Sequence, residues 1–279
     1  MPLKFAHSKI QKSWHKKRGG VLVNPGRTLA IANNVFWEVI RARVLYFIMV
    51  FGLFFIGAMR LVPEYAVLTE DKILLDLGIA AIGILGLIVA AFVGTAPIQN
   101  EIENRTVLVL LAKPISRAEF IVGKHLGLCA VLAVLITVTM ALYLGLMSLS
   151  QIDYPLFSLI VAAFYLFLEL SLLTAVAIAL SVFTSSLLAT LLTFAVYVMG
   201  HLSEDIVTAG ELSESPTLEA ITRGLYLILP DLSRLDLKNQ AVYGILPDAS
   251  ILIFNFLYAL FYIMLLLAIA NLIFSRREF

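Results

Sequence analysis

Six long apolar runs divide the chain, and short polar connectors separate them. A transmembrane α-helix needs about 20 predominantly apolar residues, and it satisfies its backbone polar groups internally. The pattern therefore predicts an all-α membrane protein whose six transmembrane helices lie at residues 44–62, 77–97, 121–148, 156–183, 187–202 and 251–273. The fifth run is the shortest of the six.

The composition agrees with this class and excludes several kinds of chemistry. Of 279 residues, 61% are hydrophobic and 14% are charged, whereas soluble domains have about 45–50% apolar and about 25% charged residues. The single cysteine, Cys129, excludes an intrachain disulfide, and the four histidines lack metal-ligand spacing. The chain has no HExxH, GxSxG or phosphate-loop motif. We therefore expect no catalytic, cofactor or metal site in it.

Basic residues are divided unevenly between the two sides of the membrane. With a cytoplasmic N-terminus, 15 of the 20 Lys and Arg residues fall on the cytoplasmic side, as the positive-inside rule requires. We therefore expect a multi-pass plasma-membrane protein with both termini in the cytoplasm. The basic inner connectors and the lack of disulfides fit a bacterial inner membrane. The first apolar run begins only near Val44, so we expect no cleaved signal peptide.

Two segments precede the first run. Residues 1–28 form a basic cytoplasmic tail, and residues 29–279 form one transmembrane domain. The stretch "LAIANNVFWEVIRAR" has an apolar helical stripe made by Ala32, Val35, Phe36, Val39 and Ile40. This pattern predicts an amphipathic helix in the cytoplasmic membrane interface, with Trp37, Glu38 and Arg41 on its other sides and Trp37 at headgroup depth. The alternative is that this segment simply extends the first span.

Two further features concern the outer half of the protein and the middle of the membrane. The extracytoplasmic loop at 203–250 contains apolar stretches punctuated by prolines, so we expect one or two short helices there.

Glu169 lies in the centre of the fourth run, where an ionised carboxylate is costly. We expect it to be protonated and hydrogen-bonded, with Tyr165 one turn earlier as the nearest partner. Glu169 lies either on a path for substrate or protons, or in a polar contact that holds helices or subunits together.

The connector between the second and third runs is unusually polar. Residues 98–117 read as a cytoplasmic helix with Glu101 and Glu103 near its start, followed by leucines that must be buried against something. Pro114 ends this helix. Ser116 then caps the next one, with Glu119 in the capping-box position. A helix with charges at one end and leucines at the other has the form of a docking element.

This connector also carries a resemblance. "EIENRTVLVLLAKPISRAEFIVGK", at residues 101–124, resembles the E-x-E-x-x-T…LL…P-x-S-R…GK signature of ABC-2 family ABC transporter permeases. The likeness covers most of the chain, and "LPDLSRLDLK" in the outer loop resembles a second motif of that family. The resemblance implies a non-catalytic permease subunit of an exporter.

The resemblance also implies partners and residue roles. Two permease copies, as a homodimer or related heterodimer, pair in the lipid membrane, and separately encoded ATPase subunits bind ATP and Mg beneath them. A periplasmic accessory protein fits this scheme, and nucleic acid does not. The connector becomes the coupling helix that seats in the ATPase. Its interface residues are Glu101, Glu103, Arg105 and Thr106, and Pro114, Ser116 and Arg117 set the angle of return into the third span.

A reading from a different class remains open. The chain could be an ATPase-independent secondary transporter or the membrane scaffold of an assembly complex. Secondary carriers more often have inverted repeats and polar breaks within their spans, and the apolar runs here are nearly free of charge. The substrate, and a direction of transport beyond what the resemblance implies, do not follow from the sequence.

Overall fold

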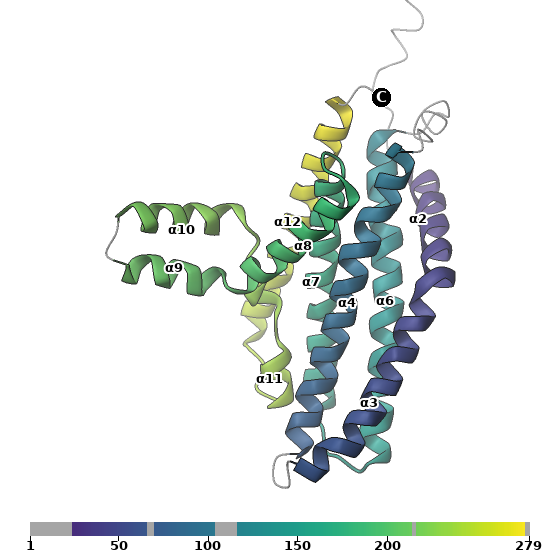
Figure 1. Ribbon diagram of the computed structural model, residues 1–279, viewed down its shortest axis with the longest axis vertical. Helices are drawn as coiled ribbons and strands as arrows, with labels where there is room; N and C mark the ends of the chain where they lie inside the picture. The colour runs from purple at the N-terminus through teal and green to yellow at the C-terminus, as the bar shows by residue number, and fades with distance from the viewer. Residues whose placement is uncertain (1–23, 66–69, 104–115, 214–215, 277–279) are drawn as a thin grey trace, which may run out of the picture.

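The computed structural model describes residues 24–65, 70–103, 116–213 and 216–276, which fold into a tall helical bundle with a helical hairpin extending from its side (Figure 1). Five helices are long and apolar enough to cross a membrane: α3 (Leu45–Tyr65), α4 (Glu70–Glu103), α6 (Arg117–Leu149), α7 (Leu156–Ser181) and α12 (Ala249–Arg276). Helix α8 (Ser186–His201) is shorter and forms a bent pair with α9 (Ser203–Leu212). Counting that pair as one span gives the six predicted spans.

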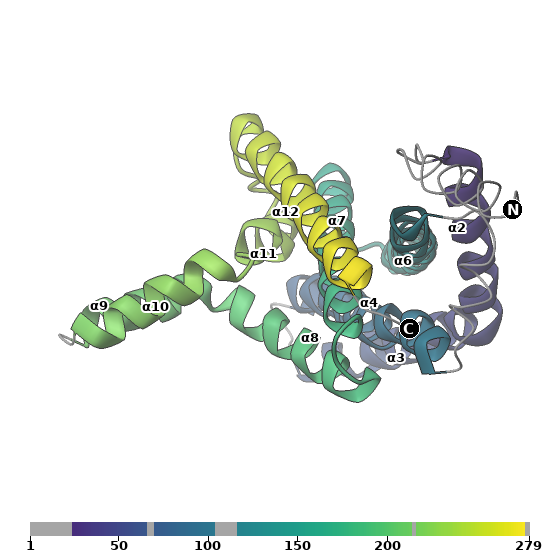
Figure 2. The same ribbon diagram turned by 90° about the horizontal axis from the view of Figure 1, so that it is seen from above.

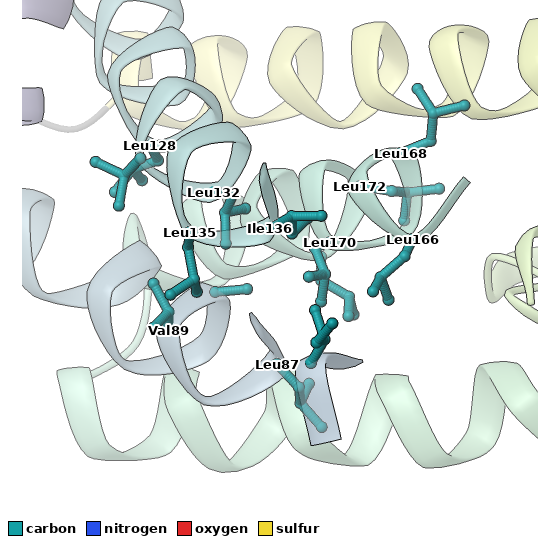
Figure 3. Close-up of a cluster of buried hydrophobic side chains, with 14 of the residues drawn as sticks. Leu87, Val89, Leu128, Leu132, Leu135, Ile136, Leu166, Leu168, Leu170 and Leu172 are labelled. Atoms are coloured by element: carbon teal, nitrogen blue, oxygen red, sulfur yellow. The ribbon is translucent and has the colours of Figure 1, made fainter. Parts of the chain in front are cut away.

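Helix α7 lies at the centre of the bundle. It contacts α4, α6, α8 and α12, and it is apolar on almost every side, which is the composition of a fully buried helix. Figure 3 shows leucines of α7, including Leu170, in one cluster of buried side chains with Leu87 of α4 and Leu135 of α6. By contrast, α3 and α12 are mostly exposed along their apolar lengths. The exposed sides therefore have the composition that lipid or another apolar protein surface requires.

Helix α2 (Pro25–Val39) begins the described chain and packs along α6. It starts where Asn24 accepts a hydrogen bond from the Gly26 backbone N–H and where Pro25 takes the first helical position. Gly123 and Gly127 of α6 allow the close approach, because a Cβ at either position would collide with α2. The views in Figures 1 and 2 both place α2 beside α6.

The predicted amphipathic helix is therefore present, with two differences. It begins at Pro25, inside the segment we expected to be tail, and a π-helical turn (Ile40–Val44) joins it directly to α3. Its buried positions Ala32, Val35 and Val39 face protein rather than acyl chains, since they pack in the interface with α6. The alternative, in which this segment extends the first span, describes the connection better. Its placement at the membrane surface stays a prediction.

The segment between α8 and α12 was expected to form one or two short helices, but its described residues form three α-helices and a 3-10 turn. Helices α9 and α10 (Pro216–Ile228) pair as the projecting hairpin (Figure 1). The following residues form the 3-10 turn η2 (Ser233–Leu235) and α11 (Lys238–Val242), and they return to the bundle beside α7 and α4. Leu232 and Leu235 are completely buried. This stretch is thus part of the core and not only a surface loop.

The second span is longer than predicted. Helix α4 continues through Pro97 to Glu103, so Glu101 and Glu103 lie at the end of a long helix and not at the start of a separate one. Our expectation that a new helix places these acids at its positive N-terminal end is therefore wrong for this part of the connector. The remainder of the predicted coupling helix, residues 104–115, lies outside the described residues.

Candidate functional site

The first turn of α6 is built around a capping box at Ser116. The Ser116 hydroxyl accepts a hydrogen bond from the Glu119 N–H at 3.1 Å, and Glu119 Oε2 accepts one from the Ser116 N–H at 2.7 Å. This arrangement satisfies two backbone donors that the helix itself leaves unpaired. The capping box predicted from the sequence is confirmed. It fixes the point at which the chain enters the third span.

The same turn of α6 holds two other helices. The second carboxylate oxygen of Glu119 accepts a hydrogen bond from the Asn24 N–H at 2.7 Å, which attaches the start of α2. Arg117 donates from one guanidinium nitrogen to the Phe274 and Ser275 carbonyl oxygens, at 2.7 and 2.6 Å, near the end of α12. These are charge-assisted hydrogen bonds, which are stronger than neutral ones. We call this group of contacts the three-helix anchor.

Aromatic contacts support the anchor. The rings of Phe120 and Phe274 stack with their centroids 5.7 Å apart, and the Arg117 guanidinium lies 5.8 Å from the Phe274 ring centroid. The anchor therefore joins α2, α6 and α12 at the end of the bundle where α4 ends and α6 begins. Sequence reasoning found Ser116, Arg117 and the capping role of Glu119. It missed the contacts with Asn24 and Phe274, because no local pattern reveals contacts over such sequence separations.

The other residues predicted at the cytoplasmic side lie in two places. Arg105, Thr106 and Pro114 lie outside the described residues. Trp37, Glu38 and Arg41 lie together on the exposed side of the α2 region, and the Arg41 guanidinium lies 5.4 Å from the Trp37 ring centroid. This is the cation–π distance range. An indole and a guanidinium side by side suit a headgroup region, which agrees with the predicted interfacial role without testing it.

A second polar cluster surrounds Glu169 in the interior. Glu169 is 1% exposed, and within the described residues neither carboxylate oxygen has a hydrogen-bond partner. Tyr165 is not its partner, contrary to our expectation, because the Tyr165 hydroxyl donates to the Leu252 carbonyl of α12. His201 Nε2, at the end of α8, lies 3.4 Å from Glu169 Oε1. The contact across helices replaces the expected contact along one helix.

The outer-loop motif completes this cluster. His201 Nε2 also lies 3.7 Å from Asp236 Oδ2, and Lys238 Nζ lies 3.3 Å from the same oxygen. Burial acts to lower the pKa of Lys238, but the charges of Glu169 and Asp236, together with Tyr197, outweigh it and raise that pKa. Lys238 is therefore a permanent cation beside two acids. We call Glu169, His201, Asp236 and Lys238 the inner polar cluster.

A neighbouring network fixes the outer-loop motif in place. Buried Asp231 accepts hydrogen bonds from Ser203 at 3.0 Å, Ser233 at 2.6 Å and Arg234 at 2.8 Å. Burial acts to raise the pKa of Asp231, but these hydrogen bonds and the Arg234 charge outweigh it and lower that pKa. The Asp231 N–H donates to the Tyr258 hydroxyl of α12. No site residue was predicted in "LPDLSRLDLK". The alternation of charged residues with leucines in this motif was the signal that could have indicated one.

Comparison with known proteins agrees with this architecture. The family model described as "ABC-2 family transporter protein" matches residues 29–279. The chain belongs to the ABC-2 transporter family. A search of curated proteins finds no match. Membership makes the chain a multi-pass membrane component of a transporter, and such ABC-2 components are generally non-catalytic. Among the described residues, no group of three or more His, Cys, Asp or Glu could hold a metal ion.

Proposed function

We propose that this chain is the permease subunit of an ABC exporter, driven by a separately encoded ATPase that docks on residues 98–117. ATP and Mg are bound by that partner, and this chain supplies no catalytic residue. The observation that carries the proposal is the three-helix anchor. It lies in the first turn of α6, directly after the connector, where a force applied to the connector enters the bundle.

The anchor offers a physical route for coupling. Glu119 holds the start of α2 at 2.7 Å, and Arg117 holds the end of α12 at 2.6–2.7 Å. When the start of α6 is displaced, these short bonds require the ends of both other helices to follow or to break. Packed helices move as rigid bodies rather than deforming continuously. ATPase closure would then be converted into a joint movement of α2, α6 and α12.

The second permease copy belongs to the same proposal. Much of α3, α8 and α12 is apolar and exposed, and α8 is too short to span the membrane alone. We infer that a pair of permeases, rather than one copy, forms the transport path in a bacterial inner membrane with both termini cytoplasmic. A periplasmic accessory protein would meet the outer loop.

A pull-down in mild detergent tests ATPase docking. The tagged chain should copurify with a soluble protein that hydrolyses ATP, and Glu101→Arg combined with Glu103→Arg should abolish this copurification without preventing membrane insertion. Asp71→Arg combined with Asp153→Arg is the matched control, since it makes the same charge change on two exposed acids of the described bundle. The control should retain the ATPase.

The outcomes separate the two classes of function. Loss of the ATPase in the connector variant alone supports docking at the connector. Equal copurification in all variants would remove these acids from the interface. A wild-type chain that purifies alone, or only with proteins lacking ATPase activity, would overturn the proposal in favour of the scaffold or the secondary carrier.

A further inference from the structure

The inner polar cluster contains an unusual meeting of hydrogen-bond acceptors. The His201 Nδ1 atom lies 3.0 Å from the Tyr197 carbonyl oxygen. A carbonyl oxygen only accepts, so Nδ1 must carry the hydrogen in this contact. The other ring nitrogen, Nε2, is then a bare lone pair in neutral histidine. It faces Glu169 Oε1 at 3.4 Å and Asp236 Oδ2 at 3.7 Å.

Three acceptors facing one another repel unless a positive charge lies between them. Glu169 is 99% buried and, within the described part of the chain, both its oxygens and His201 Nε2 lack a hydrogen-bond donor. An unsatisfied polar group in such a setting is costly, and an unpaired charge is costlier still. These acceptor atoms therefore need a hydrogen-bond donor between them.

Counting charges identifies what is missing. Asp236 and Lys238 form an ion pair at 3.3 Å, so their charges cancel. Ionised Glu169 with neutral His201 leaves one net negative charge in the interior. One proton, bound either by His201 Nε2 or by Glu169, makes the four side chains neutral and supplies the absent donor. A proton is the cation that we assign to this position, because one lone pair of His201 Nε2 or of a Glu169 oxygen is enough to bind it.

Among the described residues, Lys238 is the one cation whose charge acts on Glu169, and it is already counted with Asp236. The cluster is enclosed by α7, which contributes Glu169, by α8, which contributes His201 and the Tyr197 hydroxyl, and by the η2–α11 segment, which contributes Asp236 and Lys238. Helix α4 approaches through Gly83, whose Cβ position would lie 3.3 Å from Lys238 Cε. The next charged pair, Asp231 with Arg234, is internally matched at 2.8 Å.

The geometry points to a one-proton binding site shared by Glu169 and His201, which fastens the end of α8 to α7 and to the outer-loop motif. The position is mechanically important, because α8 ends at His201 and the chain turns by 66° into α9. When the proton is lost, the interior gains a net negative charge and the fastening weakens. The inference does not depend on ATPase docking, because the site contains none of the connector residues 98–117.

A pH series of stability measurements tests this site on the full chain in mixed detergent micelles. Above pH about 6.5, an unfolded chain has ionised Glu and neutral His, while the folded chain holds one extra proton. Stability falls with pH wherever the folded state binds more protons. We therefore expect the wild-type folding equilibrium constant to fall, by up to about tenfold per pH unit, as the pH rises from the unfolded histidine pKa of about 6.5 to the pH at which the folded site loses its proton.

Glu169→Gln is the decisive variant. The amide N–H₂ of glutamine supplies a permanent donor to His201 Nε2, so this variant should fold at pH 7 and lose the fall above pH 7. Glu219→Gln is the control, because it removes an exposed acid that pairs only with Arg223 in the described structure; it should keep the wild-type slope. An equal slope in the wild type and Glu169→Gln would overturn the proposal.

A second measurement covers the case in which Glu169→Gln does not fold. Nitrogen-15 NMR of histidine-labelled wild-type protein, with His201 assigned by its loss in His201→Gln, reports the state of Nε2 directly. A protonated or strongly hydrogen-bonded Nε2 at neutral pH supports the shared proton. A bare, unbonded Nε2 at neutral pH would rule it out.

Discussion

The contact between α2 and α6 gives the sharpest structural prediction, at Gly127. An alanine Cβ there would lie 2.7 Å from the Ala32 carbonyl oxygen and 2.8 Å from Val35 Cβ. Ordinary van der Waals contact begins near 3.4 Å, so α2 would have to move away by about 0.7 Å, since a close-packed interior leaves no spare room. Gly127→Ala should therefore loosen the packing of α2 on α6.

The magnitude follows from a matched control in the same helix. At Gly145 an added Cβ meets no atom within 4 Å, so Gly145→Ala changes only helix propensity, which favours alanine by about 0.5–1 kcal/mol. Gly127→Ala receives the same gain but also overpacks the interface, which typically costs about 1–3 kcal/mol. The difference between the two variants isolates the packing effect, so Gly127→Ala should be less stable than Gly145→Ala by about 1–3 kcal/mol.

The assay is reversible denaturation of both variants in mixed micelles, combined with hydrogen–deuterium exchange. Exchange of the backbone amides in residues 25–39 should rise in Gly127→Ala and stay at the wild-type level in Gly145→Ala. Stabilities that agree within error, with unchanged exchange in α2, would refute the close approach of the two helices. A loss of exchange protection along the whole bundle would instead indicate global misfolding, and Gly123→Ala, whose added Cβ would lie 2.9 Å from Ile31 Cβ, would then be compared with Gly145→Ala.

Two further predictions concern individual carboxylates. Glu119→Gln should lower the free energy of unfolding by about 1–3 kcal/mol, because one amide oxygen cannot replace two charged acceptors. The variant should still copurify with the ATPase, but the stimulation of ATP hydrolysis by transport should fall. Unchanged stimulation would exclude the three-helix anchor from coupling. Asp231 has a lowered pKa, so its stabilisation is present above the unfolded value of about 3.9 and is lost as pH falls through the folded value. Asp231→Asn should therefore lower the free energy of unfolding by about 1–3 kcal/mol at pH 7. Below pH about 4, the variant should lose less of its stability than the wild type does. A pH series of melting curves tests this, and an equal loss of stability in both proteins below pH about 4 would contradict it.

Much of the fold follows from local pattern. The spans were predictable because each apolar run is long enough to cross the bilayer and because helices satisfy their own hydrogen bonds. The cap at Ser116 was predictable for a similar reason, since a capping box involves residues only three positions apart. The length of α4 was not, because the acids after the apolar run suggested the start of a separate helix, whereas α4 continues to Glu103.

The candidate sites depended on tertiary contacts. Tyr165 and Glu169 are one turn apart, yet the Tyr165 hydroxyl faces α12 while Glu169 meets His201 of α8. Likewise, nothing local to Asp236 or Lys238 indicates that an outer-loop motif returns to the core beside a mid-span acid. Such pairings arise from the way separate helices pack.

The sequence by itself determined the class of the protein, the number and bounds of its apolar segments and its resemblance to a transporter family, because hydrophobic length and short-range spacing are properties of the chain alone. Only the tertiary structure decided which polar groups from distant parts of the chain meet. It attached α2 and α12 to the first turn of α6 through Glu119 and Arg117, and it placed His201 against Glu169. The physical reason is that helix packing brings together residues far apart in sequence, and the pairing that results is set by the whole bundle and not by any one segment.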